Sequence, residues 1–141
     1  MVAIKSEQNA PRIFDEALAA HSAGDHSLAR SRYEEVLSIE PSHSEAQHNI
    51  GTIFFGNSEY HTALVYFKKA LEINPNISLF WAHYIETLIK LDRIIEAKSL
   101  VEAAKKSGLF CKNLAEISEF LEKKHKEPGA EFIDELNTLM D

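Results

Sequence analysis

Hydrophobic residues in the middle of the chain recur at intervals of three and four, the spacing that places side chains on one face of a helix. Ile50 and Phe54, with Phe55 less regularly, form one apolar stripe. A second stripe follows at Ala63, Phe67, Ala70, Leu71 and Ile73. Asn57 and Ser58 lie between the two stripes and interrupt the first. The pattern therefore predicts two amphipathic helices joined by a short turn.

The same pattern recurs along the chain with a period of 34 residues. One position of the period holds alanine in each unit, at Ala29, Ala63 and Ala97. The position four residues later holds a larger residue, at Tyr33, Phe67 and Val101. Turn residues recur at Gly24-Asp25, Asn57-Ser58 and Asp92. Proline, which cannot continue a helix, ends the first two units, and glycine stands one residue short of that position in the third: Pro41, Pro75 and Gly108. The predicted units are residues 10–43, 44–77 and 78–109.

Packing between antiparallel helices explains the residue types in these columns. Small residues at Gly51 and Ala63 allow two helices to approach closely, and the Phe67 ring is expected to fill the space beside them. After each proline, a serine hydroxyl is available to cap the next helix, from Ser42, Ser44 or Ser78.

The remaining segments are predicted to be a leader over residues 1–9 and a capping helix over 110–127. Apolar residues at Phe110, Leu114, Ile117 and Leu121 give the capping helix its stripe. Such a helix covers the apolar face that the last unit of a stack would otherwise expose. Pro128-Gly129 then breaks the chain, so residues 128–141 are predicted to be a linker and a short amphipathic helix. The stripe of that helix is Phe132, Ile133, Leu136, Leu139 and Met140.

The repeat resembles the tetratricopeptide repeat, a 34-residue helix–turn–helix unit. The middle unit matches the pattern of this family at Ile50-Gly51, Phe54, Tyr60, Ala63, Phe67, Ala70 and Pro75. The third unit supplies the tryptophan of the family as Trp81 but carries Ile85 in place of the small glycine, and the first unit is more degenerate. The resemblance implies an all-α, right-handed superhelical solenoid of three helix–turn–helix repeats with a C-terminal capping helix.

In this family the first helix of each unit lines a concave groove, so the resemblance implies a protein–protein interaction module that binds a peptide or a partner protein there. The groove residues that it implies are Phe14, Leu18, His21, His48, Asn49, Thr52, Phe55, His83, Glu86 and Lys90. Some members hold a peptide backbone with an asparagine ladder, and here only Asn49 matches. Members that clamp the acidic tails of chaperones use cationic and asparagine side chains where this chain has Phe14, Leu18, Leu79 and His83, which disfavours that ligand.

Histidine and cysteine carry little predicted chemistry. Cys111 is the single cysteine, which excludes an internal disulfide framework and a cysteine-based zinc site. His48 and His83 occupy neighbouring columns and are predicted to approach each other, but no carboxylate or cysteine completes a metal site around them. His21 and His26 are five residues apart, which is not a same-face helical spacing. We therefore expect neither a metal nor a cofactor.

No catalytic motif stands out in the chain. It has no glycine-rich phosphate loop and no Gly-x-Ser-x-Gly elbow, so we expect it not to be an enzyme. The net charge of -7 disfavours nucleic-acid binding, because contacts to phosphate need cations. No secretory signal and no run of 18 apolar residues occurs, so we expect a cytoplasmic protein with no membrane partner.

Two alternatives remain open. Residues 67–126 carry 11 basic and 8 acidic groups, whereas residues 127–141 carry only 5 acidic ones, so the final helix could dock on its own solenoid, continue the repeat array or mediate self-association through residues 130–140. The third unit also resembles N-terminal repeat segments of bacterial multidomain proteins. On that reading the chain is the substrate-docking part of a larger glycosyl-, methyl- or sulfotransferase whose catalytic domain lies beyond Asp141.

Overall fold

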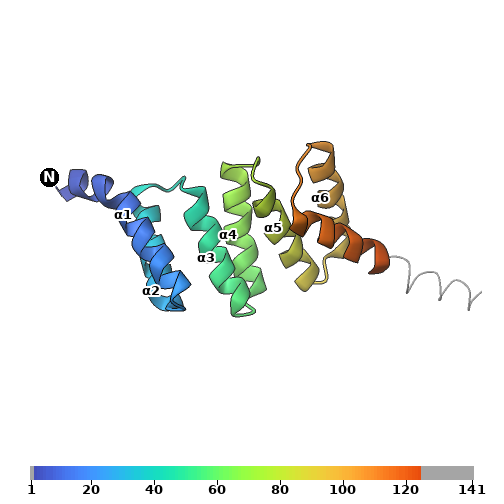
Figure 1. The fold of residues 1–141 in the computed structure, drawn as a ribbon, viewed down its shortest axis with the longest axis horizontal. Helices are drawn as coiled ribbons and strands as arrows, with labels where there is room; N and C mark the ends of the chain where they lie inside the picture. The colour runs from blue at the N-terminus through green and yellow to red at the C-terminus, as the bar shows by residue number, and fades with distance from the viewer. Residues whose placement is uncertain (1, 125–141) are drawn as a thin grey trace, which may run out of the picture.

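The computed structural model describes residues 2–124, with side chains described from residue 9 onwards. Six helices follow one another in a row (Figure 1): α1 (Val2–Ser22), α2 (His26–Ile39), α3 (Ser44–Gly56), α4 (Tyr60–Ile73), α5 (Ser78–Lys90) and α6 (Ile94–Lys106). A further helix over residues 112–124 ends the described part of the chain. Residues 2–124 contain no β-strand. The predicted all-α fold is confirmed.

The helices form a stack in which substantial contacts within the described chain join helices that are consecutive in sequence. The contacts within the pairs α1–α2 and α3–α4 are the most extensive, and α2 also packs on α3 and α4 on α5. Contact of each repeat with only its neighbouring repeats is the defining property of a solenoid. Such a stack extends along one direction, as Figure 1 shows.

The turns within the three pairs contain one residue each in the left-handed backbone region. These residues are Gly24 (φ 82°), Ser58 (φ 62°) and Asp92 (φ 59°). They are spaced by 34 residues and fall in the turns that the sequence predicts. Only the first position has the glycine that adopts this conformation without steric cost, so the other two turns hold strained backbone.

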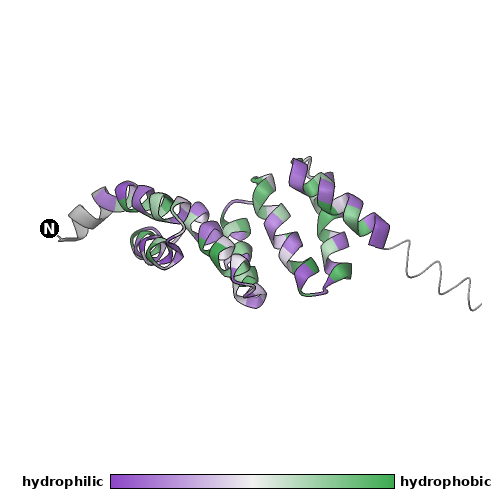
Figure 2. Ribbon diagram, turned by 60° about the horizontal axis from the view of Figure 1, so that its bottom comes forward, coloured by the Kyte–Doolittle hydropathy of each residue, from purple (hydrophilic) through white to green (hydrophobic). Residues whose placement is uncertain are grey.

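The core follows the repeat columns. Ala29, Ala63 and Ala97 have no exposed surface, and Phe67 is buried beside them. A Cβ atom added at Gly51 would lie 2.6 Å from the Phe67 ring, so only glycine fits at this helix contact. The predicted roles of Gly51, Ala63 and Phe67 in close helix packing are confirmed. Figure 2 shows the resulting pattern, in which hydrophobic residues alternate with polar ones along each helix.

The helix caps differ from the prediction that serine provides them. At α3 the cap is His43, whose ring Nδ1 accepts a hydrogen bond from the Ala46 N–H at 3.1 Å. At α5 the cap position is Ile77, which makes no side-chain hydrogen bond. The serine prediction is wrong because each helix begins at Ser44 or Ser78 itself, one residue past the position from which a side chain can cap.

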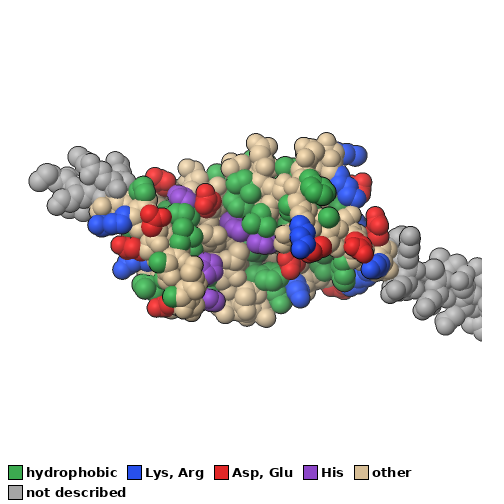
Figure 3. All heavy atoms as spheres, in the orientation of Figure 1, with side chains coloured by type: hydrophobic (Ala, Val, Ile, Leu, Met, Phe, Trp, Pro, Cys, Tyr) green, Lys and Arg blue, Asp and Glu red, His purple; other side chains and the backbone are tan. Residues whose placement is uncertain are grey.

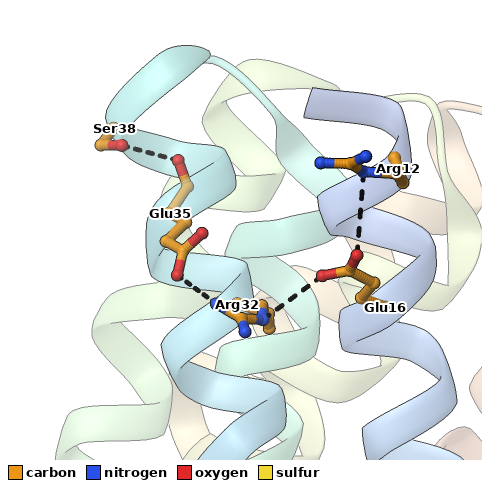
Figure 4. Close-up of polar contacts among 5 residues, drawn as sticks. All are labelled: Arg12, Glu16, Arg32, Glu35 and Ser38. Carbon is orange, nitrogen blue, oxygen red and sulfur yellow. Dashed lines mark hydrogen bonds and ion pairs between the residues drawn. The ribbon is translucent and has the colours of Figure 1, made fainter. Parts of the chain in front are cut away.

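An exposed group of ion pairs links α1 to α2 (Figure 4). Arg32 on α2 contacts the Glu35 carboxylate on its own helix, and its Nε lies 3.4 Å from Glu16 Oε2 on α1. Glu16 is also 3.8 Å from Arg12. These side chains are between 35% and 68% exposed, so the pairs orient the two helices more than they stabilise them.

The predicted segment boundaries can be compared with the structure at the two ends of the stack. Helix α1 begins at Val2 and contains Pro11, so it extends into the segment predicted as a leader. A proline inside a helix removes one backbone hydrogen bond, and the alanine and long side chains before it favour helix. At the other end, residues 112–124 lie within the predicted capping helix. The predicted linker and amphipathic helix of residues 128–141 lie outside the described residues.

Candidate ligand groove

We call the face of the stack along α3, α5 and the helix of residues 112–124 the inner groove, and the sequence predicts that it continues along α1. Two adjoining cavities lie along its C-terminal half, on either side of α5. The first has a volume of about 130 Å³ and is lined by Thr52, Phe55, Phe67, His83 and Glu86. The second has a volume of about 280 Å³ and is lined by Glu86, Ile89, Lys90, Asn113, Glu116, Ile117 and Phe120. Glu86 lines both cavities, so the two form one continuous surface.

A pair of histidines from consecutive repeats lies in the wall of this groove. The Nε2 atom of His48 on α3 is 2.6 Å from Nδ1 of His83 on α5. Their rings are nearly parallel, with centroids 4.8 Å apart. The predicted approach of His48 and His83 is confirmed. His48 is only 6% exposed and also stacks on the Phe80 ring, so it supports the groove from below its surface.

The histidine pair is one end of a hydrogen-bonded chain that crosses all three repeats. His48 Nδ1 lies 3.3 Å from the Asn49 side-chain oxygen, and the Asn49 amide donates to the Tyr33 hydroxyl at 3.3 Å. The Tyr33 hydroxyl lies 3.0 Å from Nδ1 of His21. Because the Asn49 oxygen can only accept, Nδ1 of His48 donates and its Nε2 accepts from His83. His83, His48 and Asn49 therefore each donate to the next group, and the hydrogen-bonded chain ends at the contact between the Tyr33 hydroxyl and His21.

Burial favours the uncharged form of the three histidines in this hydrogen-bonded chain. Burial, with a smaller effect of neighbouring His83, lowers the pKa of His48 to about 4. Burial also lowers the pKa of His83, and burial followed by the proximity of His26 lowers the pKa of His21. Since a neutral imidazole is both a donor and an acceptor, the hydrogen-bonded chain needs no charge. Figure 3 shows histidine and hydrophobic side chains across the middle of this face, with most charged side chains toward its ends.

The other residues predicted for the groove differ in their exposure. Phe14 is half-buried against the rings of Tyr33 and His43, whereas Leu18 is 39% exposed. The Thr52 hydroxyl donates to the Asn49 carbonyl oxygen at 2.7 Å. Further along the groove, Phe55 and Glu86 are half-buried and Lys90 is exposed. Of the predicted residues, Thr52, Phe55, His83 and Glu86 line one cavity together, and Lys90 lines the next.

Sequence reasoning missed one support of the groove and part of its lining. The fully buried Tyr33 hydroxyl on α2 holds the Asn49 amide from below. Asn113, Ile117 and Phe120 reach the groove from the helix of residues 112–124, which was treated only as a cap. The signal for the latter is present in the sequence, because these residues follow Leu79, His83 and Glu86 by the repeat period of 34.

The histidines form no metal site in the described part of the chain, where no group of three potential ligands could hold a metal ion. His21 and His26 nevertheless come together, with ring centroids 5.6 Å apart. Their spacing of five residues does not separate them, because the turn at Gly24 reverses the chain between them. Among the described residues, no helix has both the length and the apolar composition needed to cross a bilayer.

Comparison with known proteins places this architecture in a family. A sequence profile of the tetratricopeptide repeat matches residues 44–77, which contain α3 and α4. The chain contains a tetratricopeptide repeat. Similar folds occur in the tetratricopeptide-repeat domain of Sgt2 from Aspergillus fumigatus, with a TM-score of 0.76, 18% identity, and coverage of 86% of this chain and 82% of that one. They also occur in the first such domain of Spaghetti (RPAP3) bound to the HSP90 peptide SRMEEVD, with a TM-score of 0.76, 13% identity, and coverage of 86% and 96%.

Curated relatives share sequence with about half of this chain. The photosystem I assembly protein Ycf3 of Synechococcus is 36% identical over 66 residues, which are 45% of this chain and 38% of that protein. The peroxisomal targeting signal receptor of Kluyveromyces lactis is 34% identical over 68 residues, or 48% of this chain and 12% of the receptor. The chain thus matches less than half the length of these relatives.

Proposed function

We propose that the protein is a non-catalytic interaction module that binds an extended peptide segment of a partner protein in the inner groove. The observation that carries this proposal is the continuous surface formed by the two cavities around Glu86. Apolar walls at Phe55 and Phe67 can bury ligand side chains, and His83 brings a hydrogen-bonding group to the same cavity. Asn49 lies next to this cavity in sequence and is linked to His83 through His48. Uncharged groups that both donate and accept suit the amides of a peptide backbone.

The related proteins support a binding role. Spaghetti (RPAP3) is bound to an HSP90 peptide, and the TPR2B domain of yeast Sti1 is in a complex with pHsp70. Ycf3 is named for its part in assembling photosystem I. Each of these roles requires recognition of another protein, which is the general activity that we propose for this chain.

The Asn49 amide is already engaged within the groove, which refines how it would act. Its oxygen accepts from His48 and one of its N–H groups donates to Tyr33. One N–H group of the amide is left to meet a ligand carbonyl. A single such donor fixes the position of an extended peptide less firmly than a ladder would, so the apolar cavities must supply most of the affinity.

A blocking substitution tests the proposal. An array of random dodecapeptides is probed with the wild type and with Thr52→Arg, which places a long side chain in the first cavity. Thr62→Arg is the matched control, because Thr62 is exposed on α4, outside both cavities. We expect wild type and Thr62→Arg to bind the same peptides, and Thr52→Arg to lose them while its circular dichroism stays helical. Equal binding by all three proteins would place the binding surface elsewhere.

A further inference from the structure

Glu86 places a charged side chain in the groove without a partner of opposite charge among the described residues. Its carboxylate lines both cavities and is half-buried, yet it forms no ion pair with any residue of the described chain. Other glutamates on the stack have arginine partners, as Glu96 has in Arg93 at 2.7 Å. Partial removal of a carboxylate from water costs free energy when no cation is paired with it, so a cation that binds beside it is favoured.

The second cavity adds to the negative charge. It is lined by Glu86 and Glu116, with Lys90 as its one basic lining residue. Glu116 is paired only weakly with Lys112, at 3.9 Å, and both side chains are more than 60% exposed. An exposed pair at this distance contributes little and leaves the glutamate accessible to another cation. The lining of the second cavity therefore carries two acidic groups against one basic group, which favours a positively charged ligand group.

The first cavity favours a different kind of side chain. Its walls include the rings of Phe55 and Phe67, and its volume of about 130 Å³ corresponds to about four water molecules. That is the scale of one aliphatic side chain, which gains from burial against aromatic rings. Thr52 and His83, which complete the walls with Glu86, carry no formal charge when His83 is neutral, and burial lowers the pKa of His83.

The distance between the cavities sets the spacing of the ligand groups. The cavities occupy the two furrows beside α5, and packed helices lie about 8–10 Å apart. An extended peptide advances about 3.4 Å per residue, and its alternate side chains point to the same side. Two residues span about 6.8 Å and four span about 13.6 Å, and these two same-side spacings lie on either side of the distance between the furrows, so the two side chains are two or four residues apart.

We infer that the groove selects extended peptides with an aliphatic residue for the first cavity and a lysine or arginine two or four residues away, facing Glu86 and Glu116. The inference rests on the proposed function and specifies the ligand class. It also predicts that this chain discriminates against acidic peptides such as SRMEEVD, the sequence held by Spaghetti (RPAP3).

The test uses peptides bound on the random array and a matched pair of variants. Glu86→Gln removes the charge inside the groove, and Glu72→Gln removes the same charge from an exposed position on the outer helix α4. For the best array peptide, each basic residue is changed to glutamine and to glutamate, and affinities are measured by fluorescence anisotropy at low and high salt. SRMEEVD serves as the acidic probe.

The expected result is enrichment of lysine and arginine two or four residues from an aliphatic residue among bound peptides. Loss of the basic residue should weaken binding about fivefold at low salt and less at high salt, as an accessible ion pair would. Glu86→Gln should abolish this difference and Glu72→Gln should preserve it.

The failures of the two ideas look different. In one outcome, peptides lose affinity for Thr52→Arg but show no preference for a basic residue, or they keep that preference with Glu86→Gln. This outcome would overturn the inferred ligand class and leave groove binding intact. Binding of SRMEEVD as tight as that of a basic peptide would do the same. An array on which Thr52→Arg binds as the wild type does would overturn both the groove and the inference.

Discussion

Acid should destabilise this protein through His48, well above the pH at which carboxylates are protonated. In the folded state the pKa of His48 is about 4, against 6.5 for an ordinary histidine, chiefly because the ring is buried. The unfolded chain therefore binds a proton at a pH at which the folded protein does not. Folding stability is complete above about pH 6.5 and falls as the pH decreases toward 4, because protons favour the unfolded state throughout that window.

The size of the effect follows from the two pKa values. Between pH 7.5 and pH 5 a single site with these values loses about 2 kcal/mol of unfolding free energy, since each pKa unit is worth about 1.4 kcal/mol. His83 and His21 also have lowered pKa values, so their contributions have the same sign. A loss of this size is a substantial part of the stability of a domain of this length, typically about 5–15 kcal/mol.

Urea denaturation followed by circular dichroism at pH 7.5, 6.5, 5.5 and 5 measures this loss. His48→Phe keeps an aromatic ring against Phe80 and removes the titrating group, so its stability should be lower at pH 7.5 but should vary much less with pH. The exposed His61 on α4, changed to Phe, is the matched control and should keep the wild-type pH dependence. A wild type whose unfolding free energy is flat across this range, or a His48→Phe variant that loses as much as the wild type, would refute the reasoning.

Three further substitutions test the packing and the turns by urea denaturation at pH 7.5. Gly24→Ala should cost about 1 kcal/mol from backbone strain alone, because its φ is 82° and no atom lies within 4 Å of the added Cβ. Ser58→Gly should raise stability by up to about 1 kcal/mol, since it relieves the same strain, and a decrease would contradict the strain argument. Ala63→Asp should cost several kcal/mol, about 3 or more, because it buries an unpaired carboxylate at a fully buried helix contact, and an unchanged midpoint would contradict the packing assignment.

The fold could be predicted because its repeat depends on contacts between residues close in sequence. Gly51, Ala63 and Phe67 belong to one helix pair, and the steric fit that restricts them acts within a few turns of helix. Such a restriction appears in the sequence as a residue type at a fixed interval. The turn positions could be predicted for the same reason, although the left-handed backbone at Ser58 and Asp92 could not, since neither residue requires it.

The groove could be predicted only in outline, because its chemistry depends on contacts between repeats. The spacing of His48 and His83 indicated that they are neighbours, but the parallel stacking and the tautomers depend on Asn49 and Tyr33. Tyr33 belongs to a buried column, and nothing in its sequence position shows that its hydroxyl accepts from Asn49. A buried tyrosine can thus fill the core with its ring and orient a neighbouring polar side chain with its hydroxyl.

The inner groove derives its character from variation at positions that the repeat holds equivalent. Asn49, His83 and Ile117 are spaced by 34 residues on successive inner helices, and they pass from an amide to an imidazole to an aliphatic side chain. The column of Thr52 and Glu86 likewise ends at Phe120. Because the backbone repeats while these side chains differ, a ligand along the groove meets a different chemistry at each helix. On the proposed function, the order of those chemistries, rather than any one residue, would set which peptide binds and in which direction.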